Sequence, residues 1–293
     1  MTFRLLPIFL TLVACAATAH AQLVTSLRLS KTQYVAGEPV IAIVTITNHA
    51  GRDLVLQGHD RTQWLDFLVK RTNGEAVTSP RTSSFGSLKI GAGQSMAREV
   101  DLTQFFHLYD PGNFSVTAII RMPGEEASGS GGTSTNRVLF TLNPGRPYWA
   151  QKVGIPGRPG QTREYRILNF SGNQKSELYA QVIDNRTGMP VRTFLLGDAL
   201  SLRKPSVTVD RSQRMHVLFL SSPTMYVHCM IDTDGRVVET KFHQRGPQGD
   251  PQLFTSPQGE VAVSNSIPYD PKAVAAEKAK QRKASDRPAF VYE

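Results

Sequence analysis

Two histidines, His216 and His228, are the side chains of this sequence best suited to chemistry, because imidazole serves both as a metal ligand and as a general base. They lie on the two arms of a predicted hairpin, residues 215–231. A four-residue turn in this hairpin places His216 opposite Cys229 and His228 opposite Val217, on the other face of the sheet. We therefore predict that the two histidines do not converge on a metal ion or a substrate.

Too few metal-ligating side chains gather along the sequence to make a recognisable site. His216 and Cys229 supply two ligands, with no carboxylate or third histidine at ligand spacing near them. Asp232 and Asp234 flank a turn, but the third oxygen-rich position of a calcium loop is missing. The sequence therefore predicts no metal and no cofactor.

Motifs of known catalytic sites are also missing. No Gly-x-Ser-x-Gly, His-Glu-x-x-His or Ser-x-x-Lys motif occurs in a suitable context. Cys229 lies in an apolar segment and is interpreted as a core thiol. The glycine-rich residues 124–136 lack the Lys-Ser or Lys-Thr of a phosphate cradle and are interpreted as a hairpin tip. We predict no catalytic residue and no enzymatic activity. The one catalytic arrangement that the sequence does not exclude is a pair of carboxylates distant from each other in the chain.

The N-terminal residues have the three parts of a secretory signal. Residues 1–4 carry one positive charge, residues 5–17 are almost wholly apolar, and Ala19-His20-Ala21 precedes Gln22. The apolar run is shorter than the roughly 20 residues that a membrane-spanning helix needs. We predict a signal peptide over residues 1–21, cleavage between Ala21 and Gln22, and export to the periplasm or the extracellular space.

A second interpretation of the same segment stays open. Leu12-Val13-Ala14-Cys15 resembles the lipobox of bacterial lipoproteins. That resemblance implies that Cys15 becomes the acylated first residue of a lipid-anchored protein. After cleavage at Gln22, by contrast, only Cys229 remains, so no internal disulfide can form and stability must come from packing.

The rest of the chain is long enough for two domains of the usual size, about 100 to 150 residues each. We predict a first domain over residues 22–145, a linker rich in proline and glycine over 146–161, a second domain over 162–270, and a basic, solvated tail over 271–293 that is disordered or only transiently helical. Short segments in both domains alternate apolar and polar residues with period two. The predicted fold class is all-β with antiparallel sheets.

The first domain contains at least six such segments, which is typical of a β-sandwich. Its Asp110-Pro111-Gly112-Asn113-Phe114-Ser115-Val116 resembles the Asp-x-Gly-x-Tyr-x-Cys corner of immunoglobulin-like domains. Tyr34–Val40 is similar to the opening strands of bacterial Ig-like and macroglobulin-like modules. The resemblance implies an Ig-like sandwich with ligand contacts on its loops, although Phe114 replaces the corner tyrosine and the cysteine pair is missing. Trp64 is interpreted as a core residue.

The second domain contains nine further strand-like segments, and its sequence repeats. Four positions recur 46 residues later, namely Pro205, Val207, Asp210 and Val217 as Pro251, Leu253, Ser256 and Val263. A period of about 46 residues resembles that of propeller blades, which implies four-stranded sheets joined by tight turns. Too few repeats are present for a closed ring, so an open stack of sheets, a single sandwich and a ring completed by oligomerisation all stay open.

The formal net charge of +9 is spread along the chain, with one local cluster of lysine and arginine in residues 272–287. Because an exported protein seldom meets nucleic acid, we predict a protein or an envelope polymer as partner, and membrane contact only through Cys15. The predicted function is that of a non-enzymatic exported binding, scaffold or adhesion-type protein of the cell envelope. The alternative is an accessory or catalytic β domain of a carbohydrate-active or peptidase-related system.

Intact mass measurement of the exported protein tests the processing prediction. We expect a mature chain that begins at Gln22 and takes up no clickable fatty acid in growing cells. A labelled wild-type protein, together with an unlabelled Cys15→Ser variant, would show instead that the lipobox is used.

Overall fold

The structure, a computed structural model, describes residues 23–58, 63–79, 84–122, 132–172 and 175–285. Strands make up 59% of it and helices 5%, so the predicted all-β class is confirmed. The predicted processing positions Cys15, Ala21 and Gln22 lie outside the described residues, as does most of the predicted hairpin tip.

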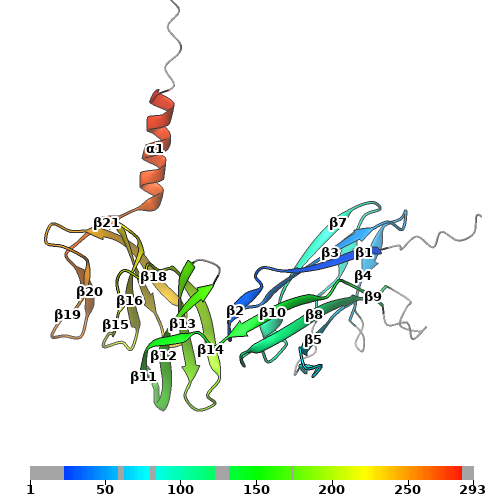
Figure 1. Cartoon of the computed structure of the whole chain (residues 1–293), viewed down its shortest axis with the longest axis horizontal. Coiled ribbons are helices and arrows are strands. Elements are labelled where there is room, and N and C mark those ends of the chain that lie inside the picture. The colour runs from blue at the N-terminus through cyan, green and yellow to red at the C-terminus, as the bar shows by residue number, and fades with distance from the viewer. Residues whose placement is uncertain (1–22, 59–62, 80–83, 123–131, 173–174, 286–293) are drawn as a thin grey trace, which may run out of the picture. The chain divides into compact units, whose positions relative to one another are not determined.

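The described chain divides into two compact units. The first is built mainly of Val40–Leu108 and Gly112–Leu142. The second consists mainly of the residues from Asn143 onward, with Val35–Pro39 and Tyr109–Pro111 grouped with it. Each unit has its own buried core, and Figure 1 labels the strands of both.

In the first unit, two sheets and a short strand pair surround one core. The sheets have the orders β1-β3-β7 and β2-β10-β8-β5, with β9 paired to β8 and β4 paired to β6. The strands are β1 (Leu23–Leu29), β2 (Gln33–Val35), β3 (Ile41–Asn48), β4 (Leu54–Leu56), β5 (Leu65–Arg71), β6 (Leu88–Ile90), β7 (Ser95–Asp101), β8 (Gly112–Ile120), β9 (Thr133–Ser134) and β10 (Val138–Asn143), with a 3-10 turn at Leu102–Gln104. Trp64 is 2% exposed in this core and donates from Nε1 to the Gly86 carbonyl, so its interpretation as a core residue is confirmed.

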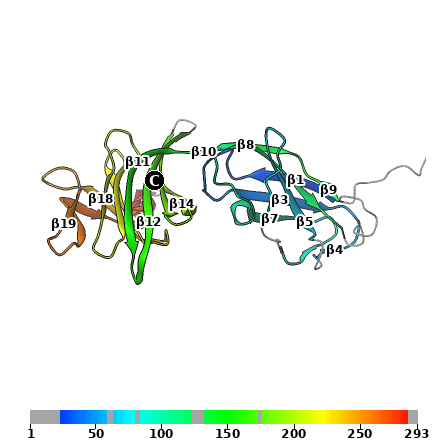
Figure 2. The ribbon, with the colours of Figure 1, turned by 90° about the horizontal axis from the view of Figure 1, so that it is seen from below.

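In the second unit, two sheets pack face to face, and a separate hairpin lies against the outer face of one of them (Figures 1 and 2). The sheets have the orders β11-β12-β13-β14 and β15-β16-β17-β18-β21, and β19 pairs with β20 in the hairpin. The strands are β11 (Arg146–Ile155), β12 (Arg158–Gly172), β13 (Lys175–Asp184), β14 (Pro190–Asp198), β15 (Ser206–Val209), β16 (Met215–Ser222), β17 (Met225–Ile231), β18 (Val237–Arg245), β19 (Gln252–Thr255), β20 (Val261–Ser264) and β21 (Ser266–Tyr269). All nine strands predicted for this region lie within observed strands.

The predicted linker over residues 146–161 is wrong, because these residues form the hairpin of β11 and β12. Its prolines and glycines occupy irregular positions of the ladder. Pro156-Gly157 is the two-residue turn, Pro147 adjoins a register shift, and Pro159 falls where the pairing jumps between Gly154 and Ile155. A proline without an N–H is tolerated at such turns and bulges, so its presence does not break the strands.

The core of the second unit comes from the facing sides of its two sheets. Tyr165 and Val182 contribute from one sheet and Val217, Phe219 and Cys229 from the other, all nearly inaccessible. Cys229 is 3% exposed, so its interpretation as a core thiol is confirmed, and burial raises the pKa of this thiol to about 11. Because successive side chains of a strand point to opposite faces, the more polar residues between these core residues lie on the outer face of the β15–β18 sheet.

Three hairpin turns of the second unit share one geometry. In each, the side chain of the first residue accepts the N–H of the fifth, and the fourth residue has a positive φ. The turns run from Asp210 to Arg214, from Asp232 to Arg236 and from Ser256 to Glu260, with Gln213 (φ 63°), Gly235 (φ 75°) and Gly259 (φ 76°) at the fourth position. Asp210 and Ser256 are equivalent positions of the 46-residue repeat, so the repeat in sequence is a repeat of turn geometry.

In the C-terminal tail, for which the sequence predicts a disordered or transiently helical segment, Pro271–Ser285 forms a helix, α1 (Figure 1). Asp270 caps it by accepting the N–H groups of Lys272 and Ala273. Proline suits the first helical position, and the alanines, lysines and Glu277 that follow are strong helix formers. Among the described residues, no helix is both long enough and apolar enough to cross a bilayer.

The turn geometry predicts that Gln213→Gly raises the free energy of unfolding by about 0.5–1 kcal/mol, because the left-handed conformation strains any residue with a Cβ. Urea unfolding of the purified protein measures this. Ser212→Gly in the same turn is the control and should bring no gain. Gly235→Ala should destabilise, since its Cβ would lie 2.8 Å from that of Arg192. A loss of stability in Gln213→Gly would contradict the strain at this position.

Candidate functional site

The histidines of the β16–β17 hairpin lie on one face, which corrects the prediction that they diverge. The turn has two residues, since Ser222 pairs with Met225, and a register shift follows Leu220. His216 therefore lies opposite Met230, and His228 opposite Leu218. A shift of one residue in pairing moves side chains to the other face of a sheet, so the register shift between Leu220 and Ser222 reversed the conclusion.

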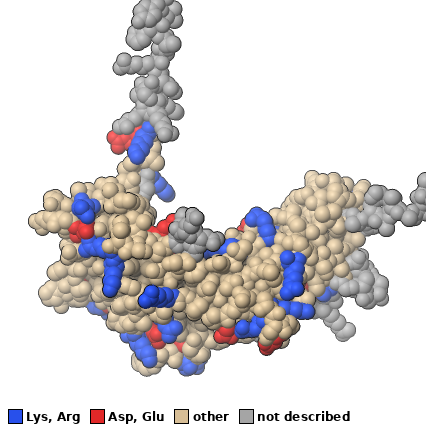
Figure 3. Space-filling model, in the orientation of Figure 1, with Lys and Arg blue, Asp and Glu red and all other residues tan. Residues whose placement is uncertain are grey.

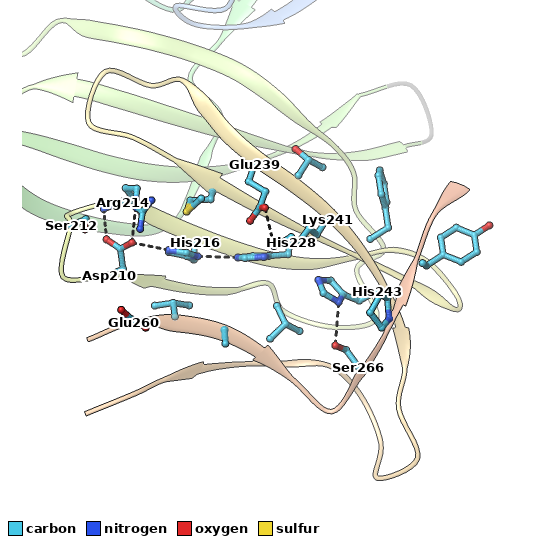
Figure 4. Close-up of a pocket in the computed structure, with 18 of the residues that line it drawn as sticks. Asp210, Ser212, Arg214, His216, His228, Glu239, Lys241, His243, Glu260 and Ser266 are labelled. Atoms are coloured by element: carbon cyan, nitrogen blue, oxygen red, sulfur yellow. Dashed lines mark hydrogen bonds and ion pairs between the residues drawn. The ribbon is translucent and has the colours of Figure 1, made fainter. Parts of the chain in front are cut away.

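His243 of β18 joins them, and we call His216, His228 and His243 the histidine row. His216 Nδ1 lies 3.0 Å from His228 Nε2, and the two rings are stacked with centroids 5.2 Å apart. The centroids of His228 and His243 are 6.2 Å apart. All three side chains are buried, and Figure 4 shows them running across the outer face of the sheet from Asp210 to Ser266.

Asp210 anchors one end of the histidine row. It opens the β15–β16 turn, where Oδ1 accepts the backbone N–H of Arg214 at 2.9 Å and Oδ2 accepts Arg214 Nε at 2.7 Å. Its Oδ2 also lies 3.3 Å from His216 Nε2. Burial raises the pKa of Asp210, but the hydrogen bonds from the Arg214 backbone, His216 and the Arg214 side chain together outweigh it and lower the pKa. Asp210 is therefore an ionised acceptor.

An ionised Asp210 determines which ring nitrogens of His216 and His228 carry a proton. Because a carboxylate only accepts, His216 must donate from Nε2, which leaves its Nδ1 as an acceptor. His228 must then donate from Nε2 to His216 Nδ1. Both rings are neutral in this arrangement, with every N–H directed toward Asp210.

Burial keeps the histidine row neutral. It lowers the pKa of His216 and His243, although Asp210 acts in the opposite direction on His216. The pKa of His228 falls to about 4, chiefly through burial and then through the neighbouring His216 and His243. The row thus carries no charge near neutral pH.

The row forms the floor of a cavity of about 1130 Å³, which we call the histidine pocket. Residues of β18 continue the floor, β20 and the turn before it form one wall, and β21 with the start of α1 forms another. Figure 4 shows Glu239, Lys241 and Glu260 around the row. Figure 3 shows Lys and Arg spread among Asp and Glu on one face of the molecule and not gathered into a patch.

Three ion pairs join six of the charged side chains that line the histidine pocket. Arg214 binds Asp210, Arg211 Nη2 lies 2.8 Å from Glu260 Oε1, and Lys241 Nζ lies 2.8 Å from Glu239 Oε1. The hydrogen bond from Lys241 lowers the pKa of Glu239. The Arg211 backbone N–H also donates to the Gly259 carbonyl, which ties the β19–β20 hairpin to the turn that holds Asp210.

The geometry gives no metal site in the part of the chain that the structure describes, where no three His, Cys, Asp or Glu side chains gather to hold an ion. Cys229 lies on the core face, away from the row. His243 Nδ1 lies 3.2 Å from Ser266 Oγ, and its buried Nε2 has no hydrogen-bond partner among the described residues. The pocket therefore offers hydrogen-bonding groups to a ligand.

Asp232 and Asp234, interpreted as turn formers, lie in the β17–β18 turn, where Asp232 Oδ1 accepts the N–H of Asp234 and of Arg236. Sequence reasoning missed the alignment of Asp210 with the histidine row. One signal was available, since histidines occur at outward positions of three successive strands. That signal identifies a row only once the pairing register of the strands, with its register shift after Leu220, is known.

No protein-family model matches the chain, and no curated protein matches it. Among solved structures, the sporulation control protein Spo0M of Bacillus subtilis is similar over 58% of this chain and 82% of its own, at 13% identity and a TM-score of 0.27. A likeness this weak supports no conclusion about the site.

The buried row predicts acid sensitivity. The folded pKa of His228 is below its unfolded value of 6.5, so the unfolded chain takes up the proton first, and stability is lost as pH falls from 6.5 to about 4. We expect a loss of about 2–3 kcal/mol over this range from His228. Urea unfolding across the range measures it.

His228→Gln keeps an N–H donor but does not titrate. This variant should lose about 1–2 kcal/mol at pH 7 and show a shallower dependence on pH. The exposed His49→Gln is the matched control and should leave the dependence unchanged. An unaltered slope in His228→Gln would rule out the row as its source.

Proposed function

We propose that this protein is an exported, non-enzymatic binding or scaffold protein of the cell envelope, and that the histidine pocket is its binding site. The observation that carries the proposal is the pairing inside the pocket, where three ion pairs neutralise six of the charged side chains and the histidines are buried and uncharged. Such a wall can hold a ligand by hydrogen bonds and apolar contact.

The electrostatics support binding over the alternative of a carbohydrate-active enzyme. Glycoside hydrolysis needs one carboxylic acid whose pKa is raised, beside a second carboxylate. In the pocket, the hydrogen bond from Lys241 lowers the pKa of Glu239. Burial raises the pKa of Asp210, but hydrogen bonds from the Arg214 backbone, His216 and the Arg214 side chain outweigh it and lower the pKa. Neither is suited to act as the general acid.

The finer fold assignments are part of the proposal. For the first unit, two sheets around one core and the start of β8 directly after Asp110-Pro111 support an Ig-like sandwich. For the second, two successive meanders, β11 to β14 and β15 to β18, followed by the β19–β20 pair support blade-like sheets. Of the three arrangements, we favour an open stack, in which β19 and β20 begin a third, incomplete sheet.

The proposal of export rests on the N-terminal residues. The proposal about the class of partner rests on the dispersed charge. A signal peptide ending at Ala21 places the protein in the periplasm or outside the cell, and acylation at Cys15 would anchor it to a membrane. Charges of both signs on the face in Figure 3 give little preference for a polyanion. We propose a protein or an envelope polymer as partner.

A pull-down from an envelope fraction tests the proposal. Immobilised wild-type protein should retain a partner that is lost in Lys241→Gln, because this change breaks the ion pair with Glu239 in the pocket floor. The matched control is Lys89→Gln, which breaks the exposed pair with Asp53 in the first unit and should retain the partner. If wild type, Lys241→Gln and control retain the same material, the pocket is not the binding site.

A further inference from the structure

The histidine pocket has a balanced charge. The side chains that line it include the cations Arg211, Arg214, Lys241 and Lys272 and the anions Asp210, Glu239, Glu260 and Asp270. These are four of each sign, and the buried histidines add none. A site with no net charge gains little by binding an ionic ligand, whose desolvation would not be repaid. The balance favours a neutral, polar ligand.

The ion pairs at the rim present hydrogen-bonding groups in a particular arrangement. Arg211 and Glu260 remain 61% and 66% exposed while bonded to each other, and Lys241 and Glu239 remain 56% and 38% exposed. Each pair therefore sets N–H donors beside carboxylate lone pairs at the surface. A hydroxyl both donates and accepts, so two adjacent hydroxyls can bridge such a pair without breaking it.

Other ligand chemistries fit this arrangement less well. A ligand carboxylate or phosphate would compete with Glu260 for Arg211, and a ligand ammonium would compete with Arg211 for Glu260. Either replacement would break one exposed ion pair to form another, so the exchange gains little. Vicinal hydroxyls require no such exchange.

The walls of the histidine pocket also carry apolar surface, which suits the ring faces of a sugar. Val261 and Val263 of β20 and Tyr269 of β21 are half-buried along the walls of the pocket. Sugar rings combine hydroxyl edges with C–H faces that pack on such surfaces. The volume of about 1130 Å³ exceeds the roughly 300–1,000 Å³ of ordinary small-molecule sites, which suits a segment of a polymer.

We propose that the histidine pocket binds a segment of a neutral carbohydrate polymer through vicinal hydroxyls that bridge its ion pairs. The inference rests on the proposed binding function and specifies its ligand. Arg211–Glu260 and Lys241–Glu239 contact the hydroxyls, and β20 and Tyr269 contact the ring faces. The turn held by Asp210 positions Arg211 against Glu260.

The test uses the full-length mature protein and an envelope fraction of the producing cells, divided into three portions. One is untreated, one is treated with periodate, which cleaves vicinal diols, and one is digested with protease. We expect binding to the untreated and protease-digested portions, loss of binding to the periodate-treated portion, and little change when salt is raised. Arg211→Gln and Glu260→Gln should each weaken binding about tenfold.

Asp53→Asn and Lys89→Gln alter the matched exposed pair of the first unit and should bind as wild type does. Binding lost with protease but kept after periodate would overturn the carbohydrate assignment and leave the proposed function standing. Binding that moderate salt abolishes would likewise overturn the assignment of a neutral carbohydrate and leave the proposed function standing. Binding that Arg211→Gln and Glu260→Gln leave unchanged would overturn the role of the ion pair. If wild type retains nothing from any portion, the proposed function itself fails.

Discussion

One buried carboxylate, Asp210, holds both the backbone and the side chains of the candidate site. Its Oδ1 accepts the Arg214 N–H that closes the β15–β16 turn, and its Oδ2 faces His216. The same turn also directs the Arg211 N–H to the Gly259 carbonyl of the β19–β20 hairpin. Because these contacts share one carboxylate, the floor and the wall of the histidine pocket are set by the same interaction.

The sheet that carries the pocket has buried side chains on both of its faces. Its inner face packs Val217, Phe219 and Cys229 against the first sheet of the unit. On its outer face, His216 and His228 are only 3% and 5% exposed although they are polar. Burying such groups is costly unless they are hydrogen-bonded. The chain from Asp210 through both rings meets that requirement.

The all-β class and the positions of most strands could be predicted, because alternation with period two is a local property of the sequence. The linker was misassigned because Pro147, Pro156 and Pro159 suggest a break in the ladder, whereas a turn and register shifts accommodate them. The site was missed for a different reason. Whether His216 and His228 share a face depends on the register shift between Leu220 and Ser222, which the alternation of residues along each strand does not reveal.

The histidine pocket is assembled from one continuous stretch of chain, from Asp210 to Lys272. Its parts follow one another as hairpins, and the contacts of Arg211 with Gly259 and Glu260 join the two ends of the stretch. Such a site can be gained, lost or transferred between proteins as a single inherited block. Changes in the first unit can then accumulate without altering what the pocket recognises.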